Sequence, residues 1–244
     1  MNHDGNRPAT ADGDDLTIVV REHAEAIVAL WSGSLGRTVR CVPSRRTLIA
    51  EHGGRTLYAK RYPTRAGADR EWRWVSRLAA AGFRVAQPVG LIRSHRGSLA
   101  VFGAVPGRSL DAWAVTARGE GWLNSWLAYV VGEVAPLVRQ LHAQRWIHRD
   151  LNCAHLFAVD PLRGGAPALI DVERMMRPRW RWQRWVVKDL ASLLASCQGF
   201  VSARAAMRFL RVYTAGQTRG ARHKLAKAVL KKAGKISRHR PRFG

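Results

Sequence analysis

The sequence predicts an α+β fold with two lobes, in which an antiparallel sheet and one helix form the N-terminal lobe and mainly helices form the C-terminal lobe. Short strand-like runs alternate with turn residues over positions 38–105, and helical spacing dominates positions 110–144. A polar loop with apolar flanks follows at positions 147–157. The chain therefore divides into a lead-in (1–15), an N-terminal lobe (16–105), a C-terminal lobe (106–218) and a basic tail (219–244).

The composition is that of a globular protein, with 47% hydrophobic residues among 244. No run approaches the about 20 consecutive apolar residues that a membrane-spanning helix needs. Residues 1–15 are polar with several acids, which argues against a signal peptide or presequence and predicts a disordered lead-in. Cys41, Cys153 and Cys197 lack ligand spacing, which favours a reducing compartment over disulfides or a zinc site.

The formal net charge of +24 predicts an anionic partner or surface. Nucleic acid, anionic lipid and a phosphorylated substrate all offer dense negative charge that Lys and Arg neutralise. A basic surface that serves only solubility is the remaining alternative. Charge alone does not choose among these partners.

The N-terminal lobe is expected to begin with a short helix, because residues 16–31 carry apolar residues at near-helical spacing. Turn residues at Pro43-Ser44 and at His52-Gly53-Gly54 then separate strand-like runs. The strands are predicted at residues 38–42, 47–51, 55–62, 85–92 and 98–105, with a helix at 69–81 between the third and the fourth. No glycine-rich turn lies between the first two strands, so a short Ser/Arg turn would cover bound phosphates.

Lys60 and Glu71 form the first candidate pair for chemistry. Lys60 lies in the third strand, with its neighbours in the sequence facing the opposite side of the sheet, and Glu71 shares one face of the following helix with Val75 and Leu78. A Glu on an apolar face needs a cationic partner, and a strand Lys held by a Glu neutralises the α- and β-phosphates of ATP in protein kinases. A solvated Lys and an exposed helix acid are the alternatives.

A hinge between the lobes is predicted at Pro106-Gly107-Arg108, followed by a helix capped by Ser109. The backbone of Gly103, Ala104 and Val105, just before this hinge, would then meet the adenine of a bound nucleotide. A long helix over residues 122–144 leads into the loop at 147–157.

That loop reads Ile147-His148-Arg149-Asp150 and continues to His155, and its layout is that of a phosphoryl-transfer loop. Asp150 would accept the proton of the attacking hydroxyl. His155 stands five positions on, where protein kinases carry an Asn that holds a metal ion. His148 and Arg149 would support the loop. A surface loop that merely spells His-Arg-Asp is the alternative.

Two further carboxylates follow the loop. Asp171 ends a short apolar strand and is the candidate magnesium ligand, because Mg²⁺ between phosphates prefers carboxylate oxygen. Asp189 lies in the helix that begins near Gln183, where an Asp would accept the backbone amides of the catalytic loop. About eighteen residues separate Asp171 from Asp189, too few for the long activation segment that docks peptides in protein kinases.

Together these residues resemble the lipopolysaccharide kinase (Kdo/WaaP) family over roughly residues 45–195. The motifs that carry the resemblance are Arg45-Arg46-Thr47-Leu48, Glu51-His52-Gly53-Gly54, Tyr58-Ala59-Lys60, Glu71-Trp72-Arg73, His148 to Phe157, Leu169-Ile170-Asp171 and Lys188-Asp189-Leu190-Ala191. The link between Lys60 and Glu71 is shorter than in heptose kinases of the family, which leaves the acceptor sugar open.

The resemblance implies a bilobal protein-kinase-like fold and transfer of the γ-phosphate of ATP, with Mg²⁺, to heptose or Kdo of the lipopolysaccharide inner core. Lys60 would then neutralise phosphates, and Asp171 and His155 would hold Mg²⁺, with orientation of Asp171 or a phosphate as the alternative for His155. It also implies a cytoplasmic protein at the inner face of the bacterial inner membrane. The alternatives are an atypical protein kinase, a small-molecule kinase and a nucleotide-binding pseudokinase that serves as a scaffold.

The basic tail suits an anionic membrane surface. Residues 190–244 contain no acid, and Leu225, Val229 and Ile236 share one side of a Lys-rich helical pattern. A basic helix of this kind gains about 1 kcal/mol per Lys or Arg near an anionic surface. A disordered tail and nonspecific RNA adhesion are the alternatives, and no specific nucleic-acid partner is expected.

Overall fold

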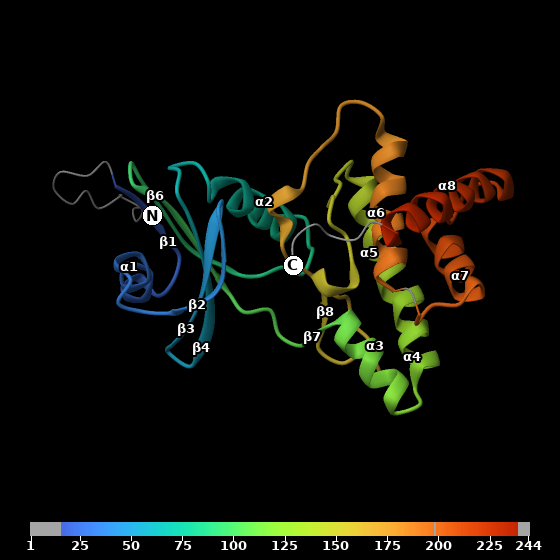
Figure 1. Cartoon of the computed structure of the whole chain (residues 1–244), viewed down its shortest axis with the longest axis horizontal. Coiled ribbons are helices and arrows are strands. Elements are labelled where there is room, and N and C mark those ends of the chain that lie inside the picture. The colour runs from blue at the N-terminus through green and yellow to red at the C-terminus, as the bar shows by residue number, and fades with distance from the viewer. Residues whose placement is uncertain (1–15, 198, 239–244) are drawn as a thin grey trace, which may run out of the picture. The chain divides into compact units, whose positions relative to one another are not determined.

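The computed structural model describes residues 16–197 and 199–238, and the chain forms two compact units, Met1–Val105 and Pro106–Gly244 (Figure 1). The predicted disordered lead-in, residues 1–15, lies outside the described residues. The first unit contains an antiparallel sheet and the second is mainly helical, so the predicted α+β class is confirmed.

The sheet of the first unit has six strands in the order β1-β5-β6-β4-β3-β2. Every neighbouring pair is antiparallel, and tight turns join β2 to β3, β3 to β4 and β5 to β6. The strands are β1 (Thr17–Val20), β2 (Arg37–Val42), β3 (Arg45–His52), β4 (Arg55–Tyr62), β5 (Pro88–Ser94) and β6 (Gly97–Gly103). Each strand predicted between residues 38 and 105 is therefore present, with shifted ends.

The helix predicted over residues 16–31 is wrong for its first part. Thr17–Val20 forms strand β1, which pairs with β5, and the helix α1 begins only at Ala24 and ends at Ser32. The run Thr-Ile-Val-Val is β-branched throughout, and pairing with a strand far along the chain outweighs the local helical spacing.

Helices cover both faces of this sheet. Ala26, Ile27 and Leu30 of α1 pack in one core cluster with Leu57 and Ala59 of β4. The other face holds α2 (Asp69–Ala80), whose Trp72 ring lies 6.1 Å from that of Phe102 in β6. Because side chains alternate along β4, Lys60 lies on the α2 side of the sheet, opposite Ala59.

The second unit begins with helices. They are α3 (Leu110–Gly119), α4 (Leu123–Tyr129), a π-helical turn (Val130–Val134) and α5 (Ala135–Ala143). The helix predicted over residues 122–144 is thus nearly continuous but contains the π turn. Pro136 explains this interruption, because proline lacks an N–H and its ring crowds the carbonyl four residues earlier.

A small sheet carries the candidate catalytic loop. It consists of β7 (Arg108–Ser109), β8 (Leu156–Ala158) and β9 (Ala168–Leu169), in that order. A Cβ at Gly107, whose φ is +96°, would lie 2.1 Å from the carbonyl oxygen of Ala158, so only glycine fits where the chain enters this unit. Two short 3₁₀ turns belong to this region: Cys153–His155 lies within the loop, and Val172–Arg174 follows β9.

The last three helices are α6 (Trp182–Ser196), α7 (Ala203–Tyr213) and α8 (Arg219–Ser237). The basic segment predicted as a tail forms α8 over most of its length and packs against α6 and α7. Ala226, Val229 and Ala233 of α8 are buried there. The apolar side expected to face a membrane is therefore used in the interior of the second unit.

Candidate active site

In the first unit, Lys60 and Glu71 form a short ion pair. Lys60 Nζ lies 2.6 Å from Glu71 Oε1, and the side chains are only 14% and 4% exposed. Tyr62, two residues along β4 and so on the same face as Lys60, donates from its hydroxyl to the other carboxylate oxygen at 3.2 Å. Glu71 thus joins β4 to α2 and fixes the direction of the Lys60 ammonium group.

The segment Gly103 to Val105 ends the first unit. The Gly103 N–H donates to the Gln87 carbonyl at 2.8 Å, and the Ala104 N–H donates to the Thr56 carbonyl at 2.9 Å. Within the described residues, the Val105 N–H has no such partner. Of the three amides expected at the adenine, this one is available to a ligand.

In the second unit, Asp189 holds the candidate catalytic loop. Its carboxylate is fully buried and accepts from the N–H of His148 at 2.7 Å and from the N–H of Arg149 at 2.9 Å. His142 Nε2 lies 3.4 Å from the same carboxylate, and His142 Nδ1 lies 2.8 Å from the Tyr213 hydroxyl. Hydrogen bonds from α5 and α7 therefore orient the side chain that fixes the loop.

The loop has backbone conformations that need this support. Arg149 has a φ of +73°, in the left-handed region that non-glycine residues rarely occupy. Lys188 donates from its Nζ to the Arg149 carbonyl, and the Arg149 guanidinium lies 5.7 Å above the ring of Trp185. Burial lowers the pKa of Lys188.

The side chain of His148, a residue of the loop, lies beneath it and is fully buried. Its Nε2 lies 3.1 Å from the Ile170 carbonyl, which assigns the proton to Nε2. Its Nδ1 is buried and has no hydrogen-bond partner within the described residues. Burial lowers the pKa of His148, because the charged imidazolium would lose its hydration.

Asp150, the candidate base, faces a cation that was not expected from the sequence. Arg174 Nη1 lies 3.1 Å from Asp150 Oδ1 and 2.9 Å from Asp150 Oδ2. The Asp150 side chain is 27% exposed and that of Arg174 is 54% exposed, so both are open to solvent. Arg174 lies three residues after Asp171, at the end of the second 3₁₀ turn.

His155 and Asp171 lie next to each other beside this pair. His155 Nε2 is 3.8 Å from Asp171 Oδ2, and His155 Nδ1 is 2.8 Å from the Asp150 carbonyl. Since a carbonyl only accepts, Nδ1 carries a proton, and in the neutral ring the lone pair is then on Nε2, the nitrogen next to Asp171. Asn152 caps the 3₁₀ turn by accepting from the His155 N–H at 3.1 Å, so its amide serves the loop.

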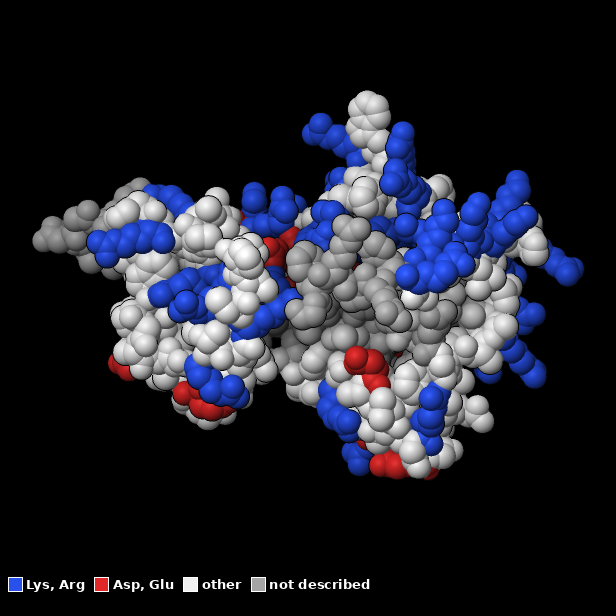
Figure 2. Space-filling model, viewed as in Figure 1, with Lys and Arg blue, Asp and Glu red and all other residues white. Residues whose placement is uncertain are grey.

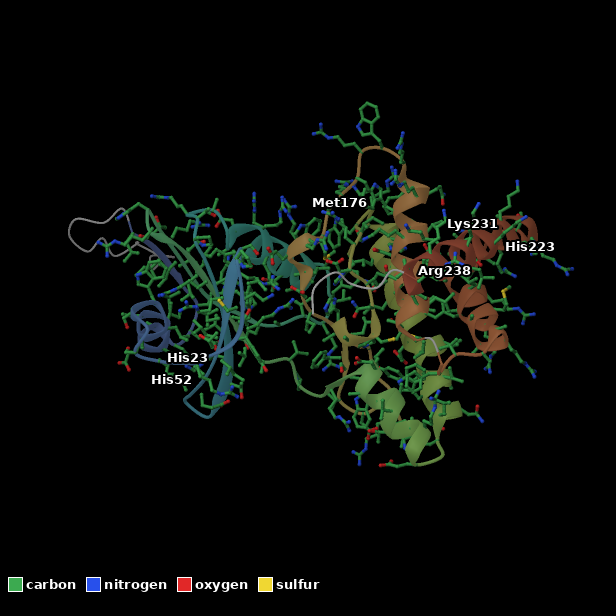
Figure 3. All side chains as sticks on the ribbon, in the orientation of Figure 1. His23, His52, Met176, His223, Lys231 and Arg238 are labelled. Carbon is green, nitrogen blue, oxygen red and sulfur yellow. The ribbon has the colours of Figure 1, made fainter. Side chains whose placement is uncertain are left out.

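Backbone hydrogen bonds join the two segments that carry this site, one with Asp150 and His155 and the other with Asp171 and Arg174. Ile147 and Met176 exchange both hydrogen bonds at 2.9 and 3.0 Å, and the Ile170 N–H donates to the His155 carbonyl at 3.0 Å. Met176 is labelled in Figure 3. The segment with Asp171 and Arg174 is therefore fixed to the loop with Asp150 and His155 at both ends.

The donors fit Mg²⁺. A carboxylate oxygen is the ligand that this ion prefers, and an imidazole nitrogen held by a backbone hydrogen bond at its other nitrogen is a supported, though softer, ligand. The described residues contain no group of three or more His, Cys, Asp or Glu side chains arranged to hold a metal. Two protein ligands are nonetheless usual for Mg²⁺ in nucleotide sites, where phosphates and water complete the shell.

Sequence reasoning missed four residues of these sites. Arg174 and Tyr62 contact the two key carboxylates directly, and His142 and Tyr213 lie behind Asp189. For Tyr62 the signal was available, because it is two residues from Lys60 on one strand face. The others depend on contacts between distant segments.

Comparison with protein families gives one match over most of the chain. The model of the lipopolysaccharide kinase (Kdo/WaaP) family matches residues 20–213. A lipopolysaccharide core heptose(I) kinase WaaP of Escherichia coli K12 is 25% identical over 232 residues, which cover 79% of this chain and 86% of the relative. A second Escherichia coli WaaP is 26% identical over 234 residues, covering 80% and 87%.

Solved structures share the fold. WaaP in complex with acyl carrier protein superposes with a TM-score of 0.74 at 24% identity, covering 90% of this chain and 98% of that one. An aminoglycoside-3'-phosphotransferase of type VIII superposes with a TM-score of 0.56 at 20% identity, covering 86% and 100%. At these identities the likeness concerns the fold, and it confirms the predicted protein-kinase-like fold.

Proposed function

The chain belongs to the lipopolysaccharide kinase (Kdo/WaaP) family, and from this premise we propose that it transfers the γ-phosphate of ATP to a sugar hydroxyl, of heptose or Kdo, in the lipopolysaccharide inner core. The family and its named relatives are kinases, so the chain is a phosphotransferase that acts on an alcohol group. The observation that carries the proposal is the loop fixed by Asp189, which presents Asp150 next to His155 and Asp171.

In the proposed reaction, Asp150 accepts the proton of the acceptor hydroxyl while that oxygen bonds to the γ-phosphorus and the bond to ADP breaks. Each Asp150 oxygen accepts once from Arg174 and keeps a second lone pair, which would accept the proton of the incoming hydroxyl. Arg174 then remains beside the atoms where negative charge develops. Positioning and electrostatic stabilisation dominate this class of reaction.

Asp171 and His155 would hold Mg²⁺, which supplies charge neutralisation at the nucleotide phosphates when bound. Three observations support this role: the carboxylate of Asp171, the distance of 3.8 Å from it to His155 Nε2, and the Asp150 carbonyl that accepts from the Nδ1 side of the His155 ring. Asp171 has a φ of +52°, in the left-handed region that non-glycine residues rarely occupy.

The first unit would bind the nucleotide. Lys60, held by Glu71 and Tyr62, would neutralise the α- and β-phosphates, and the free Val105 N–H, with the Gly103 and Ala104 backbone, would meet the adenine. Gly103 and Ala104 would contribute carbonyl groups, since their N–H groups are already used. Pro43 and Ser44 form the β2–β3 turn that stands in place of a glycine-rich loop.

A lipid-linked acceptor implies work at a membrane, and we propose a cytoplasmic enzyme at the inner face of the bacterial inner membrane. None of the helices described here combines the length and the apolar character required to cross a bilayer. Attraction to anionic lipid would come from exposed Lys and Arg side chains, including those of α8. Because the apolar side of α8 is buried, α8 would act through charge alone.

Two alternative functions are each supported by one specific observation. A small-molecule kinase is favoured by the fold likeness to an aminoglycoside phosphotransferase, whereas the short link from Asp171 to Asp189 disfavours a protein substrate. A pseudokinase scaffold is favoured by the Arg174 contact that occupies Asp150. The retained set of Lys60, Glu71 and Asp171 disfavours a scaffold, which would not need it.

The testing experiment is phosphate transfer from labelled ATP, with Mg²⁺, onto lipopolysaccharide or its isolated inner core, with protein and water as competing acceptors. We expect label on the glycolipid, and Asp150→Asn should abolish turnover while ATP binding by calorimetry persists. Undiminished transfer by Asp150→Asn would refute the role of Asp150. Label on protein alone would indicate an atypical protein kinase, and ATP binding without any transfer would favour the scaffold.

A further inference from the structure

Residues 177–181 form a basic loop, Arg177-Pro178-Arg179-Trp180-Arg181, ahead of α6. Figure 1 shows it rising beyond the N-terminal end of that helix. Trp180 is 80% exposed, more than any other large apolar side chain among the described residues. An indole in this position leaves a large apolar surface in water, and tryptophan is enriched at interfaces where an apolar region meets a wet one.

The two tryptophans that follow have roles inside the unit. The Arg145 guanidinium lies 4.8 Å above the ring of Trp182, and that of Arg149 lies 5.7 Å above the ring of Trp185. Both rings are partly buried. Trp180 alone of the three makes no such contact within the described chain.

Arginines surround a hollow next to this loop. Arg145, Arg177, Pro178 and Arg179 line a space of about 500 Å³. The guanidinium groups of these three arginines form no ion pair with any carboxylate of the described residues. Their mutual repulsion is relieved by an anion, and guanidinium groups bind phosphate oxygens in a bidentate manner.

We propose that the basic loop docks the protein onto an anionic phospholipid surface, with the Trp180 indole in the interfacial region and a lipid phosphate in the arginine hollow. Tryptophan is enriched at the membrane–water interface, and arginine gains from the negative surface potential there. The loop follows the segment with Asp171 and Arg174 by three residues, so docking brings the candidate catalytic loop close to a lipid-linked acceptor.

Two observations favour lipid over the other candidates. Single-stranded nucleic acid is bound by successive aromatic rings, and Trp180 is the one highly exposed ring among the described residues of the second unit. On α8, Lys231 and Arg238 are exposed, but the apolar residues of that helix are buried against α6 and α7. Figure 2 shows blue side chains at the loop and along α8 without red among them, so α8 adds long-range attraction.

The test measures binding of the full-length protein to vesicles of phosphatidylglycerol and phosphatidylcholine, without ATP, by co-sedimentation. Withdrawing even about 50 Å² of indole from water corresponds to roughly tenfold in affinity, so Trp180→Ala should weaken binding by about that factor. Replacing Arg177, Arg179 and Arg181 by Gln should weaken it by about fivefold per residue, near 100-fold together.

Matched controls separate docking from general charge. Leu162→Ala removes another exposed apolar side chain, 59% exposed, and should leave binding unchanged. Replacing Lys231, Lys232 and Lys235 of α8 by Gln removes the same charge and should cost clearly less than the loop triple. Equal losses from the two triples, or an unchanged affinity of Trp180→Ala, would overturn the docking role.

A second measurement reports insertion directly. Vesicles with brominated acyl chains should quench part of the tryptophan fluorescence of the wild type, and this part should vanish in Trp180→Phe although that variant still binds. Identical quenching in both proteins would contradict insertion of Trp180. Because neither assay needs phosphate transfer, failure of docking and failure of the proposed kinase activity are distinguished.

Discussion

Single side chains determine what the candidate base can do. Asp150 is bridged by one guanidinium nitrogen of Arg174, and its own backbone carbonyl fixes the proton of His155. The same residue therefore connects a cation, a potential metal ligand and the site of proton transfer. Small changes in charge at these positions should alter turnover more than folding.

Replacement of Arg174 tests this connection. We expect Arg174→Ala to lower kcat by about 10²-fold, because removing one preorganised donor at a developing negative charge typically has that effect. The KM for ATP should change less, and Arg174→Lys should recover part of the rate. Steady-state kinetics on the core acceptor measure both parameters.

The control for Arg174 is another arginine paired with an aspartate. Arg163 lies 3.4 Å from Asp160, is 89% exposed and lies outside the loop. Arg163→Ala should keep wild-type kcat, because exposed pairs contribute little. If both variants behaved alike, Arg174 would have no part in the reaction.

Because His148 is buried, we expect the stability of the protein to depend on pH. The folded-state pKa of His148 is lowered by burial, so the unfolded chain takes up this proton first as pH falls. The contribution of neutral His148 to stability is complete above the unfolded pKa, about 6.5, and is lost as the pH falls from there through the lower folded value. Stability should therefore decrease on acidification.

Thermal unfolding between about pH 5 and 8 measures this effect. His148→Asn should show a shallower decrease of Tm below about pH 6.5 than the wild type, although it is less stable at neutral pH. His223→Gln on α8, an exposed position labelled in Figure 3, should keep the wild-type slope. A His148→Asn slope equal to that of the wild type would exclude His148 as the source.

These contacts differ in how far sequence predicts them. The Lys60–Glu71 contact follows from strand alternation and helical spacing, because a Glu on an apolar face needs a partner. Arg174 gives no such signal. Its position beside Asp150 depends on the left-handed backbone at Asp171, three residues earlier, and on the Ile147–Met176 bridge, which joins segments that are distant in sequence.

At the scale of elements, the apolar and basic pattern of α8 predicts a helix correctly. It does not predict that this helix packs against the rest of the second unit. Its residues do form an amphipathic helix, but composition alone does not say which apolar surface covers the apolar side. Here α6 and α7 cover it, with Ala226, Val229 and Ala233 buried. Strand β1 is the parallel case, since its partner β5 lies far along the chain.

Two adjacent positions of α8 test its packing. Val229 is 3% exposed and Leu230 is 59% exposed, so the first faces the interior of the second unit and the second faces solvent. Val229→Ala should lower the free energy of unfolding by about 2 kcal/mol, because it leaves a small cavity between helices. The Tm should fall by roughly 4–8 °C.

Leu230→Ala should change the free energy of unfolding by less than about 0.5 kcal/mol. Both values come from denaturant or thermal unfolding of the whole chain. Equal stability of the two variants would show that α8 does not pack as described. It would also restore the possibility of a helix that detaches to lie on a membrane.

For the molecule as a whole, the formal charge of +24 follows directly from the sequence. The structure adds where the basic side chains lie. The basic side chains in view on the second unit gather at the loop of residues 177–181 and along α8 (Figure 2). Nucleic acid is attracted to such a surface whatever its sequence. Recognition of a particular sequence would need side chains shaped to base edges.

Binding to two unrelated DNA duplexes of equal length tests whether any nucleic-acid partner is specific. We expect both to bind with affinities within about tenfold of each other, far from the 10³-fold or greater preference of specific complexes. Both affinities should fall by about 10³-fold between about 50 and 200 mM salt, because binding by charge releases counterions. Fluorescence anisotropy over a salt series measures this.

The loop triple, with Arg177, Arg179 and Arg181 replaced by Gln, is the control, because it lowers the charge without changing the fold. It should reduce the salt slope by the same amount for both duplexes, since each lost phosphate contact removes about 0.9 from that slope. A preference for one duplex that persists at high salt would instead indicate a nucleic-acid partner. In that case the arginine hollow would have to be reconsidered as a phosphate site on nucleic acid, and vesicle binding would be the weaker of the two interactions.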